Sequence, residues 1–285
     1  MLDKKYIQVK NEFDYLSEVV DKFPEGRTLS FLLVGPPGCG KTLFGVSLAK
    51  HFSSSYEIID GSPQMDRRDI EGCWELQNGE TVFTYGPLAR AMMKANEEGI
   101  CFVIFNEPNA VRPSEQISLN AALAESHINL ISKAGERISL NPDAKLVVIG
   151  TMNTNVLGIN NLQEAFSDRF YLTWKFDYPE ERKEIEIIKE VTGCKHGFAS
   201  ALVEIAQELR KAAIQDKVLA NTFSTRLSVH FAEIVLGMKD SFLTENIKGI
   251  IVNKLTTDER ERRFVKDLLQ GKDFLWKIKE SLKDE

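Results

Sequence analysis

Eight consecutive residues combine flexible glycines with a lysine and a hydroxyl: Gly35, Pro36, Pro37, Gly38, Cys39, Gly40, Lys41 and Thr42. They match the pattern GxxxxGK[ST], in which glycines let backbone N–H groups converge on phosphate oxygens. The ammonium of Lys41 should reach the β- and γ-phosphates, and the hydroxyl of Thr42 should bind Mg²⁺. We therefore expect these eight residues and the following Leu43 to bind ATP together with Mg²⁺.

The surroundings of this loop favour phosphate binding over a chance match on a glycine-proline turn. Residues 29–34 form a continuous apolar run, typical of a strand that is buried on both faces. Residues 41–52 have the pattern of a helix. A strand, a glycine-rich loop and a helix in this order place the helix N-terminus, with its favourable dipole, at the phosphates.

Polar side chains follow two further predicted strands. Asn106 and Glu107 come after residues 100–105, and Asn153 comes shortly after residues 145–150. Glu107 could polarise an attacking water, and Asn153 could touch the γ-phosphate or position that water. Asn106 could hold a Mg²⁺-bound water but brings no charge, so we expect weaker metal binding or slower turnover. Alternatively, these residues are ordinary polar positions at strand ends.

Two arginines have both a functional and an ordinary interpretation. Arg169 follows a short predicted helix and could be an arginine finger offered to a neighbouring subunit, or could pair with Asp168 or a helix C-terminus. Arg226 falls in the first turn of a predicted helix, where positive charge is slightly unfavourable. That conflict indicates a phosphate-facing role, although a solvated arginine is the alternative.

Strand and helix signals alternate through the first part of the chain, which predicts an α/β fold with a mostly parallel sheet and helices on both faces. Two predicted hairpins, at residues 76–83 and 127–140, interrupt this pattern, the first about the strong turn signal Asn78-Gly79. Only helical patterns follow Tyr178. We expect residues 1–176 to form the nucleotide-binding domain and residues 177–285 a small all-helical domain. The expected strands are 29–34, 56–60, 100–105, 145–150 and 170–174.

Composition excludes several other classes of protein. The net charge of −6 and the pI of about 5.5 argue against a broadly basic nucleic-acid-binding surface. No run of 18 apolar residues predicts a membrane span, and the polar amino-terminal stretch does not resemble a signal peptide. Four widely spaced cysteines, Cys39, Cys73, Cys101 and Cys194, fit reduced thiols in a cytoplasmic protein.

Five motifs, in this order along the chain, resemble those of the AAA+ ATPases. Residues 35–42 resemble Walker A, Asn106-Glu107 Walker B, Asn153 sensor 1, Arg169 the arginine finger and Arg226 sensor 2. The segment Thr84–Ala91, in which a hairpin leads through Gly-Pro-Leu into a helix, is similar to the MoxR-like group with its NirQ, NorQ, CbbQ and GvpN relatives. In that group the two hairpins correspond to the helix-2 insert and the pre-sensor-1 hairpin, and both can face a central pore or the substrate.

The resemblance implies a ring, usually hexameric, with ATP bound between subunits. Lys41, Thr42, Asn106, Glu107 and Asn153 would act from one subunit, Arg169 would act in trans, and Arg226 would belong to a helical lid. Many members of the group are chaperones that remodel a protein partner, often one with a von Willebrand factor A domain. Asn106 departs from the usual aspartate of Walker B, which affects the expected hydrolysis rate more than nucleotide binding.

Two other functions remain open at this stage. A nucleotide-regulated scaffold would follow if Asn106 has slowed hydrolysis to a switch. A nucleic-acid-linked motor is the third possibility, because Thr151-Met152-Asn153-Thr154 is similar to the Met-Asn-Thr of McrB-like restriction GTPases. The charged residues expected next are replaced by Asn155-Val156-Leu157, and the acidic pI also disfavours that motor.

Overall fold

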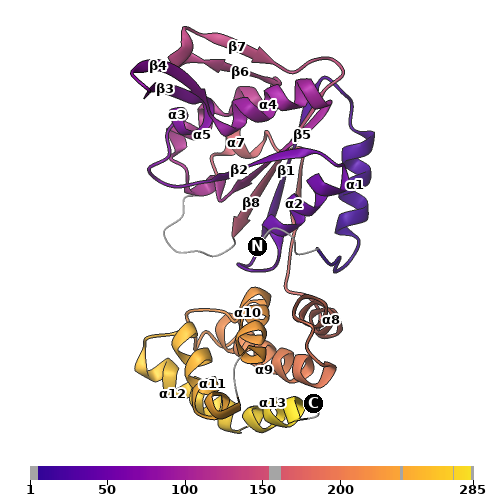
Figure 1. Cartoon of the computed structure of the whole chain (residues 1–285), viewed down its shortest axis with the longest axis vertical. Coiled ribbons are helices and arrows are strands. Elements are labelled where there is room, and N and C mark those ends of the chain that lie inside the picture. Colours follow the sequence, from indigo (N-terminus) through magenta and orange to yellow (C-terminus); the bar gives the residue numbers. More distant parts are fainter. Residues whose placement is uncertain (1–5, 154–161, 238–239, 272, 284–285) are drawn as a thin grey trace. The chain divides into compact units, whose positions relative to one another are not determined.

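The chain divides into two compact units (Figure 1). The first comprises residues 1–36 and 40–176, and the second comprises residues 177–285 together with residues 37–39 of the phosphate loop. The structure is a computed structural model that describes residues 6–153, 162–237, 240–271 and 273–283. The McrB-like comparison at residues 154–157 and the first five residues of the polar amino-terminal stretch lie outside these ranges. Each unit is described by itself.

A five-stranded sheet forms the centre of the first unit, in the order β2-β5-β8-β1-β9 (Figure 1). Every neighbouring pair in it runs parallel. The strands are β1 (Arg27–Gly35), β2 (Ser55–Asp60), β5 (Ile100–Asn106), β8 (Lys145–Asn153) and β9 (Leu172–Lys175). The predicted parallel sheet is therefore confirmed. Because all five strands point the same way, their carboxyl ends gather at one edge.

Strand β9 begins later than the sequence suggests. The sequence predicts it over residues 170–174, but the chain first makes a tight turn, closed by hydrogen bonds from Arg169 N to Phe166 O and from Phe170 N to Ser167 O. The ring of Phe170 is buried in the core and stacks edge-on against Phe166. Burial of this ring in a turn mimics the apolar signal of a strand.

Helices pack on both faces of the sheet, as predicted. Residues of α4 (Pro87–Glu98) join one core cluster with Cys101, Val103 and Phe105 of β5. On the opposite face of the sheet, α2 (Lys41–His51) packs closely against β5. A Cβ atom added to Gly45 of α2 would lie 3.0 Å from the side chain of Ile104. The other helices of this unit are α1 (Glu12–Lys22), α3 (Arg67–Glu71), α5 (Pro113–Ser118), α6 (Asn120–Ala124), α7 (Glu164–Ser167) and the 3₁₀ turns η1 (Pro108–Ala110) and η2 (Ile131–Lys133).

Two antiparallel hairpins extend from the first unit. Strands β3 (Gly72–Gln77) and β4 (Glu80–Tyr85) meet at Asn78-Gly79, both of which have positive φ, as a tight hairpin turn requires. Strands β6 (His127–Leu130) and β7 (Glu136–Ser139) are joined through η2. Trp74 Nε1 donates a hydrogen bond to Ser132 O at 2.7 Å, which links the two hairpins.

The second unit consists of helices α8 (Glu181–Thr192), α9 (His196–Ile214), α10 (Thr225–Leu236), α11 (Asp240–Leu255), α12 (Glu259–Gly271) and α13 (Phe274–Lys283). They enclose their own apolar core, which includes Phe198, Leu202, Leu209 and Phe231. One ion pair, between Glu184 and Arg210, is buried beside this core. Within the described ranges, no helix is both long and apolar enough to cross a membrane.

Candidate functional site

The phosphate loop connects the end of β1 to the start of α2. Gly38 and Gly40 have φ values of +72° and +99°, a region that disfavours residues with a Cβ atom. Lys41 is buried, with 6% of its surface exposed, and its Nζ donates to the carbonyls of Gly35 and Pro36 at 2.9 Å each. The loop therefore holds this ammonium in place at the N-terminus of α2, where an anion is favoured.

An asparagine amide connects Lys41 to the carboxylate of Glu107. Lys41 Nζ donates to Asn153 Oδ1 at 2.8 Å, while Asn153 donates through Nδ2 and through its backbone N–H, the latter at 3.3 Å, to the two oxygens of Glu107. The side chains come from the ends of β8 and β5 and from the start of α2. The predicted sensor residue thus lies between the phosphate lysine and the predicted catalytic carboxylate.

The environment of Glu107 is unusual for a carboxylate. It is half-buried, and this desolvation raises its pKa above the usual value, although the N–H of Asn153 and the charge of Lys41 act in the opposite direction. Its backbone is in the left-handed region, at φ +50°, and its N–H donates to Thr151 O at 2.7 Å. A strained backbone and a desolvated carboxylate are features that concentrate at functional sites.

A second asparagine amide connects Thr42 to an aspartate that was not among the predicted site residues. Asn106 Oδ1 accepts hydrogen bonds from the hydroxyls of Thr42 and Thr151, at 2.7 and 2.9 Å. Asn106 Nδ2 donates to Asp60 Oδ1 at 2.8 Å. Asp60 ends β2 and is in register with Asn106 across the β2–β5 pair, so the carboxyl-edge rule for parallel sheets could have identified it.

The oxygen atoms of these side chains fit Mg²⁺, which prefers oxygen ligands and keeps several of its waters. Thr42 offers a hydroxyl, Asn106 an amide oxygen and Asp60 a carboxylate, and all three lie at the carboxyl edge of the sheet. Thr42 would bind the ion directly.

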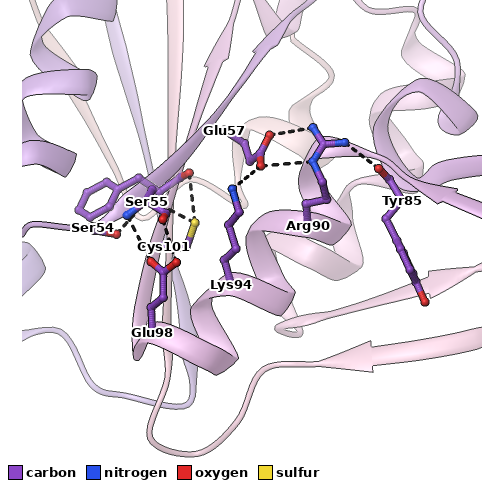
Figure 2. Close-up of polar contacts among 9 residues, drawn as sticks. Ser54, Ser55, Glu57, Tyr85, Arg90, Lys94, Glu98 and Cys101 are labelled. Atoms are coloured by element: carbon purple, nitrogen blue, oxygen red, sulfur yellow. Dashed lines mark hydrogen bonds and ion pairs between the residues drawn. The ribbon is translucent and has the colours of Figure 1, made fainter. Parts of the chain in front are cut away.

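Strand β2 lies at an edge of the sheet and is fastened to α4 by side-chain contacts (Figure 2). Glu57 accepts hydrogen bonds from Arg90 Nη2 at 2.8 Å and from Lys94 Nζ at 2.9 Å. Although burial acts to raise it, these contacts hold the pKa of Glu57 below the usual value. Ser55 Oγ donates to Glu98 at 2.8 Å. These contacts fix the strand that ends in Asp60.

The two predicted arginines differ in how they stand to the phosphate loop. Arg169 is exposed, and its carbonyl accepts a hydrogen bond from Ser30 Oγ, in the first half of β1, whereas the phosphate loop follows the last residue of that strand. It is therefore not part of the group around Lys41 within this chain. Arg226 belongs to the second unit, where it is exposed in the first turn of α10 after the N-cap Ser224. Its backbone N–H donates a hydrogen bond at 3.3 Å to the carbonyl of Gly38, a phosphate-loop residue of the same unit.

A phosphate loop between β1 and α2, a polar pair at the end of β5, an asparagine at the end of β8 and a separate helical unit define a P-loop protein of the AAA+ class. The family model for the AAA domain (dynein-related subfamily) matches residues 30–170. The model for the CbbQ/NirQ/NorQ C-terminal region matches residues 184–271. Together the two models span both compact units.

Individual proteins agree with these matches. Protein NorQ of Paracoccus denitrificans is 30% identical over 84% of this chain and 85% of its own length. The denitrification regulatory protein NirQ of Pseudomonas aeruginosa is 28% identical over 73% of this chain and 76% of its own. The chain belongs to the CbbQ/NirQ/NorQ family of MoxR-like AAA+ proteins.

Solved structures support the same fold. A mutant form of RuvB from Thermotoga maritima superposes with a TM-score of 0.54 at 14% identity, covering 94% of this chain and 72% of that one. At this level of identity the likeness concerns the fold alone.

Proposed function

We propose that the protein is a Mg²⁺-dependent ATPase that works as a ring and remodels or activates a protein partner. The observation that carries this proposal is the hydrogen-bonded path from Lys41 through Asn153 to Glu107. It joins the group that binds the γ-phosphate to the group that can act on water. Membership of the CbbQ/NirQ/NorQ family supports the same activity.

In the proposed reaction, the backbone N–H groups of residues 35–42 and Lys41 bind the phosphates. Mg²⁺, when bound, would neutralise developing charge on the β- and γ-phosphates. Glu107 accepts the proton of the attacking water, whose oxygen bonds to the γ-phosphorus as the bond to ADP breaks. Asn153 holds the Glu107 carboxylate in place and also contacts Lys41. Asn153 therefore couples the presence of a γ-phosphate at Lys41 to the position of Glu107.

Assembly is the second part of the proposal. Arg169 is exposed, and it lies beside the first half of β1, away from the end of β1 at which its own phosphate loop begins. This position suits an arginine finger that completes a neighbouring subunit's site. We propose residues 1–176 as the nucleotide-binding domain and residues 177–285 as a lid carrying Arg226. The family resemblance suggests a hexamer, a partner with a von Willebrand factor A domain, and a cytoplasmic location where ATP is supplied.

A slow nucleotide-regulated scaffold is the second candidate, and it is favoured by one observation. Asn106 is neutral where a charged residue would hold Mg²⁺, and both of its amide ends are already engaged by Thr42, Thr151 and Asp60. In this candidate, ATP binding orders the ring and hydrolysis only resets it. The difference between the two candidates is therefore the turnover rate.

Steady-state hydrolysis by wild type, Asn106→Asp and Glu107→Gln separates them. The motor requires wild type to turn over far faster than Glu107→Gln, whereas equal rates leave only the scaffold. The Glu107→Gln protein with ATP is also the form in which to capture partners for identification by mass spectrometry. Hydrolysis that rises on adding DNA or RNA and falls steeply with salt would instead indicate a nucleic-acid-linked motor.

A further inference from the structure

The predicted Mg²⁺ site has a neutral residue, Asn106, next to a charged one, Asp60. Asn106 is a neutral amide, and the carboxylate of Asp60 accepts a hydrogen bond from its Nδ2 at 2.8 Å. Mg²⁺ sites in phosphate-binding proteins are built with one or two carboxylates in addition to substrate phosphates. Asp60 is the carboxylate that hydrogen bonds connect to Thr42, through the amide of Asn106.

The backbone fixes Asp60 in this position. Asp60 and Asn106 are Cα partners in the parallel β2–β5 pair, so their side chains project from the same face of the sheet. Gly61 N donates to Asn106 O at 2.8 Å. A Cβ atom on Gly61 would come within 2.3 Å of Glu107 O, so only glycine permits the chain to approach this closely.

The orientation of the Asn106 amide follows from its neighbours. The hydroxyls of Thr42 and Thr151 can either donate or accept a hydrogen bond, whereas the carboxylate of Asp60 can only accept. The NH₂ group of Asn106 must therefore face Asp60. The amide oxygen then faces Thr42 and Thr151. Two hydrogen bonds and one amide group therefore separate the Thr42 hydroxyl from the Asp60 carboxylate. Asp60 is exposed, so its second oxygen can accept from water.

We propose that Asp60 supplies the negative charge that Asn106 lacks, by accepting hydrogen bonds from waters of a Mg²⁺ ion bound at Thr42. This inference depends on the proposed function, because it needs Mg²⁺ and nucleotide at the phosphate loop. A magnesium ion with one of its waters spans about 7 Å between protein oxygens, given Mg–O distances of about 2.1 Å and ordinary hydrogen bonds. Two hydrogen bonds of 2.7 and 2.8 Å, joined through the Asn106 amide, connect the side chains of Thr42 and Asp60.

The test measures how much a divalent metal strengthens nucleotide binding, and it does not depend on turnover. The probe is a fluorescent, non-hydrolysable ATP analogue, titrated with EDTA present and again with saturating Mn²⁺. In Asp60→Asn the gain in affinity from Mn²⁺ should fall about 10-fold or more, the usual effect of losing an outer partner of a metal site. Affinity in EDTA should stay at the wild-type level, which also shows that the variant is folded.

Two further variants make the test specific. Asp143→Asn removes the same charge from an exposed residue before the amino end of β8, and its Mn²⁺ gain should equal that of wild type. The double variant Asp60→Asn/Asn106→Asp exchanges the two side chains, and it should recover the gain lost in Asp60→Asn. Recovery would show that the charge, rather than the identity of residue 60, is what the metal requires.

The outcomes separate this inference from the proposed function. A wild-type protein that does not bind the analogue, or binds it without any gain from Mn²⁺, contradicts the proposed function. A wild type with a clear gain that persists within about two-fold in Asp60→Asn overturns the role of Asp60 alone. Failure of the double variant to recover the gain of Asp60→Asn overturns it as well.

Discussion

The buried ion pair of the second unit should be essential to the stability of that unit. Glu184 of α8 is fully buried, and both of its oxygens accept from Arg210 of α9, at 2.7 and 2.5 Å. Arg210 Nε also donates to Phe223 O at 2.7 Å, and the Thr225 hydroxyl donates to Glu184 at 2.8 Å. Three segments, α8, α9 and the start of α10, meet at this pair.

Arg210→Met removes the cation and leaves the Glu184 carboxylate with the Thr225 hydroxyl. Breaking a buried pair from one side costs about 3–5 kcal/mol, because the remaining charge is buried without compensation. With a urea m-value of about 2 kcal/mol/M, the unfolding midpoint of the second unit should fall by about 2 M. Circular dichroism follows this transition, and hydrogen exchange of peptides from residues 177–285 localises it.

Lys277→Met is the matched control, since Lys277 pairs with Glu204 of the same helix α9 but both side chains are more than a third exposed. An exposed pair contributes about 0.2–1 kcal/mol, so this variant should shift the midpoint little. The double variant Glu184→Gln/Arg210→Met should recover part of the loss because it removes the stranded charge. Equal midpoints for Arg210→Met and Lys277→Met would refute the reasoning.

Three further predictions concern the phosphate site. Lys41→Ala should abolish detectable binding of the fluorescent ATP analogue, while unchanged affinity would mean that the loop does not hold nucleotide. Arg169→Ala should lose hydrolysis but keep nucleotide binding, and mixing it with Lys41→Ala subunits should restore some activity; loss of binding would contradict the assignment. The raised pKa of Glu107 means that its charged form weakens the fold as pH rises through that pKa. Glu107→Gln should therefore raise the melting temperature at neutral pH and lose this advantage near about pH 4, below the carboxyl pKa of the unfolded chain. A gain that is equal at both pH values would contradict it.

Much of the first unit could be predicted from local patterns. The apolar runs of β1, β5 and β8 are buried on both faces, so their signals are continuous, and the order of polar residues after them follows from parallel pairing. The predicted start of β9 is displaced because the buried ring of Phe170 in a turn carries the same signal as a strand residue. Periodicity cannot distinguish the two.

The contacts inside the site could not be predicted in the same way. Residues 60 and 106 are far apart in sequence, and their meeting depends on β2 pairing with β5 at one register. The bridging roles of Asn106 and Asn153 likewise arise from which amide end faces which neighbour. In the second unit, the meeting of Glu184 with Arg210 requires the packing of α8 on α9, which residue types do not encode locally.

The most direct test of the central claim is single-turnover cleavage of ATP by the assembled protein, wild type against Glu107→Gln, with analogue affinity measured on the same samples. If Glu107 activates the water, its loss should slow cleavage by about 10²-fold or more, while affinity stays unchanged. Equal cleavage rates in the two proteins would contradict the account. A slower rate that merely follows weakened binding would contradict it equally.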